Sequence, residues 1–232
     1  MLKSGFPRFA TLSDRALTVH LGDQIDTVTF QAVRSLSRQL EATPPVGMFE
    51  FVPAFTTVSI YYDPLRTSGA ELTSLITDLV TVRDAAIDSQ PRVVEIPVCY
   101  GGEFGSDLEF VAKHAKLTPQ EVIEIHAGAD YLVHLIGFAP GFPYLGGMSS
   151  KIAAPRRSSP RLKVPVGSVG IAGEQTGIYP LETPGGWQII GRTPLALFRP
   201  NEDPPTLLQA GDIVRFRSIS QEEFREMQKE RA

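Results

Sequence analysis

The chain has 232 residues, of which 42% are hydrophobic and 21% charged, and its formal net charge is −4. This composition is typical of a globular protein with a hydrophobic core, and the length suits one large domain or two small ones. It excludes a disordered, collagenous or coiled-coil chain, and an acidic protein has no general basic field that attracts nucleic acid or anionic lipid. Neither nucleic acid nor a membrane is therefore expected as a partner.

The first 90 residues alternate short strands with amphipathic helices. Strands are predicted where apolar residues recur at every second position, namely Leu17–Val19–Leu21, Phe49–Phe51 and Val58–Ile60–Tyr62. Helical spacing of apolar residues from Ile25 and Val28 to Leu40, and again from 72 to 82 behind a capping box of Ser68 and Glu71, predicts two helices. The order strand, strand, helix, strand, strand, helix fits a small α+β sandwich with both helices on one face of an antiparallel sheet. We expect this domain at residues 1–90, with a linker at residues 87–92.

A second pattern begins at residue 91. A strand around Ile96 precedes two short helices, whose first turns are predicted at Ser106, with Glu109 three residues later, and at Thr118, with Glu121. Eleven of the twenty glycines then fall between residues 137 and 191 and separate short apolar runs at 131–136, 168–172 and 188–190. A last strand at 213–216 and a charged tail from residue 221 follow. Glycine at tight corners between short strands is typical of a β-barrel, so residues 91–232 are expected to form a barrel domain.

The aromatic and glycine-rich loop at residues 137–147, GFAPGFPYLGG, is the most unusual segment. Together with Trp187 in PGGWQ, it is expected to line a concave or partner-facing side of the barrel, because such loops combine ring faces with accessible backbone amides. The alternative is that the glycines only turn corners and the rings fill the core. Core burial competes well for Phe138, which directly follows a strand. Tyr144, with a polar tip on an apolar ring, is a better candidate for a site or an interface.

Positive charge gathers in the same region. Residues 151–201 carry seven basic side chains against two acidic ones, a local balance of 7 − 2 = +5. Because guanidinium groups bind carboxylate and phosphate in a bidentate fork, Arg156 and Arg161 are candidates to hold an anion. A solvated basic face or a docking surface for an acidic partner fits the pattern equally well. The full set of substrate- or partner-binding candidates is Phe138, Phe142, Tyr144, Arg156, Arg161, Ser168, Gln175, Trp187, Arg192 and Thr193.

Signals for catalysis by this chain alone are weak. Ser168 lies in VGSVG, where a nucleophile elbow requires glycine at the position of Val166. The single cysteine, Cys99, is expected to be buried, and His126 and His134 are expected to be structural. No metal-ligand spacing and no phosphate-binding glycine loop occurs, so we expect no metal site and no tightly bound cofactor, and the catalytic residues stay unassigned. One cysteine and no apolar leader predict a cytoplasmic protein.

Six strings carry a resemblance to a known family. They are VCYGGEFGSDL at 98–108, GFAPGFPYLGG at 137–147, VPVGSVGIAG at 164–173, QTGIYP at 175–180, PGGWQIIGRTP at 184–194 and LLQAGDIVRF at 207–216. In this order they resemble the B subunits of 5-oxoprolinase, the family that includes KipI and is also called allophanate hydrolase subunit 1. The likeness covers most of residues 94–217, while the N-terminal part fits in pattern only. Val166, where alanine is commoner in the family, is the visible departure.

The resemblance implies an α+β domain followed by a cyclophilin-like β-barrel, similar to part of the carboxyltransferase domain of urea amidolyase. It also implies that the chain works as a B subunit, together with C and A subunits, in the ATP-dependent conversion of 5-oxo-L-proline and water to L-glutamate, ADP and phosphate. ATP is then a co-substrate of the complex. The alternative function is that of a KipI-type inhibitor, which binds a sporulation histidine kinase and blocks its autophosphorylation. A prolyl isomerase rests on fold analogy alone.

Overall fold

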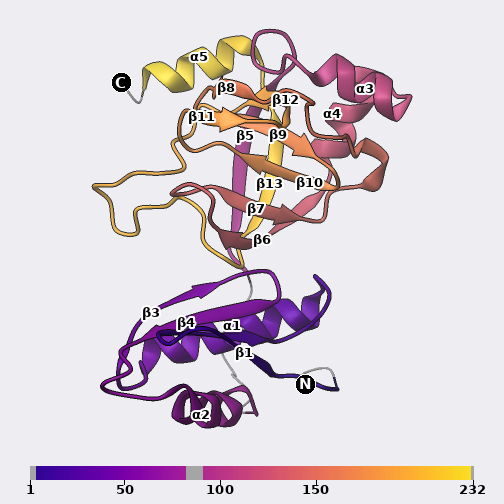
Figure 1. Ribbon diagram of the computed structural model, residues 1–232. Coiled ribbons are helices and arrows are strands. Elements are labelled where there is room, and N and C mark those ends of the chain that lie inside the picture. The colour runs from indigo at the N-terminus through magenta and orange to yellow at the C-terminus, as the bar shows by residue number, and fades with distance from the viewer. Residues whose placement is uncertain (1–3, 82–90, 231–232) are drawn as a thin grey trace. The chain divides into compact units, whose positions relative to one another are not determined.

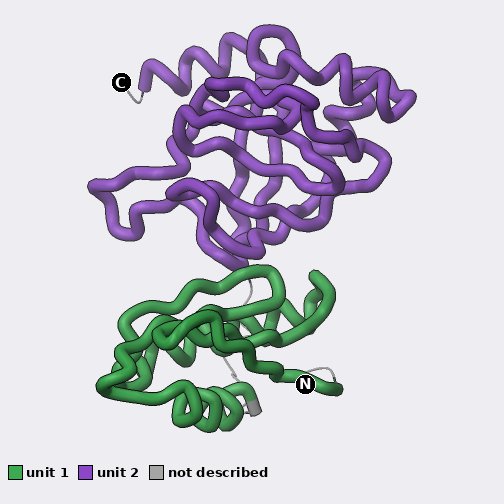
Figure 2. Tube along the Cα trace, viewed as in Figure 1, with its two compact units in different colours: residues 1–90 green, residues 91–232 purple. Residues whose placement is uncertain are grey.

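The computed structural model describes residues 4–81 and 91–230. The chain divides into two compact units, residues 1–90 and 91–232 (Figure 2). The linker expected at 87–92 lies outside the described residues except for Pro91 and Arg92, which are exposed. Within the described ranges, no helix has the length and apolar character needed to cross a membrane.

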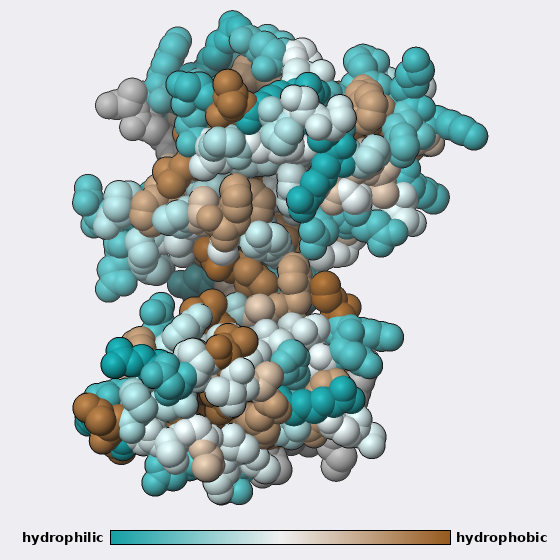
Figure 3. All heavy atoms as spheres, viewed as in Figure 1, coloured by the Kyte–Doolittle hydropathy of each residue, from teal (hydrophilic) through white to brown (hydrophobic). Residues whose placement is uncertain are grey.

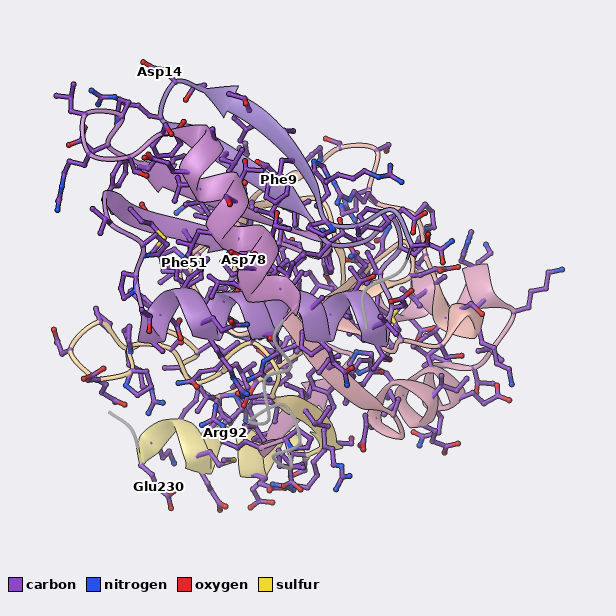
Figure 4. All side chains as sticks on the ribbon, turned by 90° about the horizontal axis from the view of Figure 1, so that it is seen from below. Phe9, Asp14, Phe51, Asp78, Arg92 and Glu230 are labelled. Atoms are coloured by element: carbon purple, nitrogen blue, oxygen red, sulfur yellow. The ribbon has the colours of Figure 1, made fainter. Side chains whose placement is uncertain are left out.

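Unit 1 is a four-stranded antiparallel sheet with two helices. Its strands are β1 (Arg8–Ser13), β2 (Ala16–His20), β3 (Met48–Pro53) and β4 (Thr57–Tyr62), in the spatial order β1-β2-β4-β3 (Figure 1). Helix α1 (Thr27–Ala42) follows β2, and α2 (Gly69–Thr81) follows β4. The β1–β2 hairpin turns at Asp14, which Figure 4 shows at the tip of the two strands. The element order is the one that the sequence predicts.

One core joins this sheet to both helices. Its buried residues are Leu17, Val19 and Leu21 within and after β2, Val58, Ile60 and Tyr62 on β4, Val33, Leu36 and Leu40 on α1, and Leu72 and Ile76 on α2. Phe9 and Phe51, labelled in Figure 4, pack against it. The predicted capping box is confirmed, since Ser68 Oγ accepts from the Glu71 N–H and Glu71 accepts from the Ser68 N–H at 2.8 Å. The apolar residues that alternate along the strands therefore pack against the apolar faces of the two helices, as expected.

Four apolar residues of the predicted stripes are exposed instead, namely Ile25, Val28, Phe49 and, on α2, Leu75. Helix α1 begins only at Thr27, with Asp26 as its N-cap, so Ile25 precedes the helix and Val28 stands off the buried face. On β3 the register passes from Met48 opposite Tyr62 to Glu50 opposite Tyr61. This bulge leaves Phe49 without a cross-strand partner and turns its ring outward, 65% exposed, because the extra residue breaks the alternation.

Unit 2 is a closed barrel. Its strands are β5 (Val93–Tyr100), β6 (Asp130–Ile136), β7 (Pro143–Gly146), β9 (Ser168–Ala172), β10 (Gln175–Ile178), β12 (Gln188–Arg192) and β13 (Ile213–Ser218). They run in the order β10-β7-β6-β13-β5-β12-β9, and β9 pairs with β10 to close the barrel. Strands β5 and β13 pair in parallel although they come from opposite ends of the unit (Figure 1). The expected α+β fold class, a sandwich followed by a β-barrel, is confirmed.

Smaller elements cover the barrel. They are α3 (Leu108–Ala115), α4 (Pro119–Ala127), the 3₁₀ turn η2 (Ser150–Ile152), α5 (Gln221–Lys229) and a separate two-stranded sheet of β8 (Arg161–Val164) and β11 (Thr183–Gly185). The capping box of Thr118 and Glu121 is confirmed. Helix α5 buries Phe224 against Phe104 and Cys99, which is buried as predicted.

The predicted cap at Ser106 is wrong. Helix α3 begins one residue later, with Asp107 at the N-cap position, and no side chain makes the capping bond. The carboxylate of Asp107 is turned away from the helix toward β8 and β12, where it has stronger partners.

Candidate functional site

Phe142, in the glycine-rich loop, is the centre of an aromatic cluster. Its ring meets those of Tyr144, Phe138, Tyr179 and Trp187 edge-on, with centroid distances of 5.2, 5.4, 5.5 and 5.6 Å. Edge-to-face contacts at such distances are the favourable arrangement for aromatic rings. The loop at 137–147 and the PGGWQ string therefore come together, as the sequence predicts.

The cluster is buried at its centre and open at one end. Phe142 is 2% exposed and Trp187 is 7% exposed, so both rings belong to the core. Phe138 is 65% exposed, so core burial, the alternative to a binding role for this residue, does not hold. Its φ of 67° lies in the left-handed region, which is unusual for a bulky residue and turns the side chain out of the line of β6. Tyr144 is half-buried.

Tyr179, which directly follows β10, is a member of the cluster that sequence reasoning missed. Burial raises the pKa of Tyr179, while a hydrogen bond from the Trp187 N–H and the charges of Arg156 and Arg161 lower it. The hydroxyl lies against the backbone of Gly185, where an added Cβ would be 2.5 Å from the Tyr179 oxygen. Glycine at 185 thus lets the Tyr179 ring reach this position. The signal in the sequence was Tyr179 within QTGIYP.

Asp107 is the second residue that was missed. Its buried carboxylate accepts from Arg161 Nη2 with 2.7 Å to each oxygen, from Arg157 Nη1 at 3.1 Å and from the Ile189 N–H at 2.6 Å. Arg161 also donates to Ser106 Oγ at 3.1 Å. The carboxylate therefore joins the start of α3 to β8 and β12.

These contacts change the predicted role of the two arginines. Arg161 Nη2 donates to both Asp107 oxygens and to Ser106 Oγ, and Nη1 donates to the Trp187 carbonyl at 3.4 Å, so both terminal nitrogens of Arg161 are already bonded within the chain. Arg156 is exposed and makes no hydrogen bond or ion pair with any residue that the structure describes. Of the predicted pair, only Arg156 keeps its guanidinium available for an external anion.

Two bonds fix the backbone on either side of Arg156. The Pro155 carbonyl accepts from Gln188 Nε2 at 2.8 Å, and the Arg157 N–H donates to the Gly186 carbonyl at 2.8 Å. The basic segment at 155–161 and the PGGWQ string, which are far apart in the sequence, therefore lie side by side.

The remaining candidates belong to the barrel wall. Ser168 is buried and stands opposite Arg192 in the β9–β12 ladder, and its carbonyl accepts from the Tyr179 N–H at 2.8 Å. Arg192 Nε donates to the Val166 carbonyl at 2.7 Å, and Thr193 Oγ1 accepts from the Leu195 N–H at 3.2 Å. Gln175 is half-buried at the start of β10. The side chains of Arg192 and Thr193 thus bond to neighbouring backbone, and the backbone of Ser168 bonds to a member of the aromatic cluster.

His126 lies in the barrel interior, where its ring is fully bonded. Nδ1 is 2.8 Å from the Tyr100 hydroxyl, and Nε2 is 2.9 Å from Thr176 Oγ1, which itself donates to the Gly170 carbonyl. Because the Thr176 proton is used on Gly170, Nε2 carries the imidazole proton and Nδ1 accepts from Tyr100. Burial lowers the pKa of His126 to about 3. The ring is neutral and structural, as predicted.

Among the residues that the structure describes, no group of three or more His, Cys, Asp or Glu side chains is arranged to hold a metal ion. The arrangement instead offers a rigid aromatic cluster with one exposed ring and a neighbouring guanidinium. It is suited to binding a small anion or a partner surface.

Comparison with known proteins first gives the class of the protein. The family model described as the carboxyltransferase domain, subdomain C and D, matches residues 7–208. This chain is also similar to part of the protein TTHA0988, whose crystal structure matches it with a TM-score of 0.80 and 36% sequence identity. The match covers 90% of this chain and 40% of the longer TTHA0988 chain. The chain is thus built as a carboxyltransferase-type domain.

Curated relatives narrow the class to a family. A protein from Bacillus subtilis that is named as the B subunit of 5-oxoprolinase is 48% identical over 227 residues, which cover 92% of this chain and 93% of the relative. A relative of the same name from Escherichia coli O157:H7 is 55% identical over 131 residues, which span 60% of its length. The chain belongs to the family of 5-oxoprolinase B subunits.

Proposed function

We propose that the chain acts as the B subunit of an ATP-dependent 5-oxoprolinase. The observation that carries this proposal is the 48% identity, over nearly the full length of both chains, to a protein of that name. In the proposed reaction the amide bond of the 5-oxo-L-proline ring is cleaved, water supplies the hydroxyl of the new carboxyl group, and ATP is hydrolysed to ADP and phosphate. ATP is a co-substrate of the complex. Nothing in the relatives' names favours the kinase-inhibitor alternative.

The chain acts in this proposal only together with the C and A subunits. Its described residues offer rigid binding groups, while the sequence contains no phosphate-binding glycine loop and no nucleophile elbow. The TTHA0988 chain supports a larger assembly, because there the equivalent region continues into a chain more than twice as long. The protein is proposed to be cytoplasmic, in keeping with its single buried cysteine.

Turnover should therefore require the mixture of subunits. We expect no ATP-dependent release of glutamate from 5-oxo-L-proline by the purified chain, and clear release once candidate A and C subunits are added. The measurement is glutamate and phosphate release with each component left out in turn. Robust turnover by this chain alone, or undiminished turnover when it is omitted, would contradict the proposal.

Phe138 is the proposed contact with a partner subunit. Its ring is 65% exposed, is supported edge-on by the buried Phe142, and extends from a strained turn, and such strain persists mainly where function requires it. Figure 3 shows hydrophobic surface over the part of the barrel where Figure 1 places β6 and β7, the strands that flank this turn. An exposed aromatic ring on a rigid base is the usual form of an interface anchor.

Replacing Phe138 by serine should weaken assembly without weakening the fold. Because interface anchors contribute about 2 kcal/mol or more, we expect the concentration of this chain that gives half-maximal turnover in the mixture to rise about tenfold or more. The matched control is Leu162→Ser, another hydrophobic residue of the barrel unit, 86% exposed on β8. An equal effect of both variants, or a drop in the unfolding midpoint of Phe138→Ser, would argue against a contact role.

A further inference from the structure

The segment around Arg156 carries an excess of positive charge that the fold does not neutralise. Arg156, Arg157 and Arg161 contribute three positive charges, and Asp107 contributes the only carboxylate paired with them in the described structure. The next basic residue, Lys163, is already paired with Glu182 at 3.0 Å. Two positive charges therefore remain unbalanced.

The backbone that carries this excess charge is held in a fixed place. The contacts to Asp107 anchor Arg161 and one nitrogen of Arg157, while bonds to Gln188 and Gly186 fix the backbone around Arg156. A fixed backbone lowers the conformational entropy that the segment loses when Arg156 binds a ligand. The guanidinium of Arg156 has no acceptor among the described residues.

The Tyr179 hydroxyl provides a second donor beside this segment. It lies against Gly185, next to the glycine whose carbonyl holds the Arg157 N–H. Tyr179 is buried, with 2% of the residue exposed, and no described residue accepts its hydroxyl proton. Arg156 and Arg161 both act on this hydroxyl electrostatically.

We propose that Arg156 and the Tyr179 hydroxyl bind the oxyanion of a small molecule, a carboxylate or a phosphate, with the Asp107–Arg161 pair as the fixed base of the site. This inference rests on the proposed function for its choice of ligands, since the substrate, the product and ATP each carry such a group. A guanidinium fork offers two parallel donors to a planar carboxylate or to two phosphate oxygens, and a phenol adds a third. Arg161 supplies charge to the site but is not its ligand-binding fork.

The test is binding by the isolated chain at constant ionic strength. The probes are 5-oxo-L-proline, L-glutamate, inorganic phosphate and ATP, and the readouts are calorimetry and the fluorescence of Trp187, the only tryptophan. Saturable binding of at least one probe is expected, and the pattern distinguishes a carboxylate site from a phosphate site. Since turnover is not measured, a missing partner cannot be mistaken for a missing site.

Three variants make the test specific. Arg156→Ala should weaken binding about tenfold or more and Tyr179→Phe about fivefold, because each removes donors to a charged ligand. Lys163→Ala, which removes a charge two residues after Arg161 on β8, should change the dissociation constant by less than about twofold, because an exposed and already paired lysine contributes little. Absence of saturable binding for every probe, or equal losses in the Arg156 and Lys163 variants, would overturn the proposal.

A conservative substitution of Arg156 separates the contribution of its bidentate hydrogen bonds from that of its positive charge. Arg156→Lys should restore the positive charge but only part of the affinity, because an ammonium group cannot offer two parallel donors. Full recovery with lysine would mean that the site recognises charge alone, and the bidentate contact would be wrong.

Discussion

Lowering the pH from 7 to 4 should destabilise the barrel unit steeply, because His126 is held neutral in the folded state. Its pKa is lowered from 6.5 to about 3 by burial. Below pH 6.5 the unfolded chain binds a proton that the folded chain excludes, so stability is fully present above 6.5 and falls until pH 3. The slope is about 1.4 kcal/mol per pH unit for one proton, or roughly 3 kcal/mol by pH 4. His134, whose pKa is also lowered by burial, adds a loss of the same sign.

Urea unfolding followed by Trp187 fluorescence at several pH values measures this slope in the barrel unit. His126→Gln should flatten it, because glutamine does not titrate. Thr176→Val should cost about 1–3 kcal/mol at pH 7 by leaving the Nε2–H without its acceptor, yet it should keep the pH slope. If the glutamine variant does not fold, an NMR titration of the His126 ring serves instead. Protonation of that ring in the native protein near pH 6 would contradict the argument.

The architecture could be predicted because local patterns determine it. Leu17 and Val19 alternate on β2, Leu36 and Leu40 recur at helical spacing, and the capping residues that start α2 and α4 stand at fixed offsets. Such signals need only a few neighbouring residues. The barrel could also be predicted from local sequence, because short apolar runs separated by glycines are typical of a closed sheet of short strands.

What failed depends on single backbone torsions or on distant contacts. Phe49 leaves the core because of one bulge. One positive φ turns Phe138 outward, which decides between the binding role and the core burial that the sequence left open. Neither feature is visible in apolar spacing. Asp107 was missed for another reason. A carboxylate before an apolar helix predicts a cap, but its real partners lie at least 50 residues further along the chain. The family resemblance rests on short sequence motifs that contain these residues or lie close to them. Only the structure shows that Arg161 is bonded to Asp107 while the Arg156 guanidinium is not bonded within the described residues.

Removing the Asp107 carboxylate should be one of the most destabilising single changes in the barrel unit. Asp107→Ala leaves two arginines without their shared partner and the Ile189 N–H without an acceptor. Loss of one member of a buried ion pair costs about 3–5 kcal/mol, because the remaining charge stays desolvated. Arg161 keeps 23% of its side chain exposed, which moderates the cost, so we expect about 3 kcal/mol.

Asp130 provides a matched control, because it also accepts two hydrogen bonds from one arginine, Arg215, at 2.6 and 2.8 Å. In this pair, however, both side chains are 55% exposed. Asp130→Ala should cost far less than Asp107→Ala, because exposed ion pairs contribute little to stability. A double variant, Asp107→Leu with Arg161→Met, should recover part of the loss, because it leaves no buried charge at either position. The measurement is the free energy of urea unfolding at pH 7. Equal costs for Asp107→Ala and Asp130→Ala would mean that burial of the carboxylate is not what fixes α3, β8 and β12 together, and the rigid base required by the proposed oxyanion site would be lost with it.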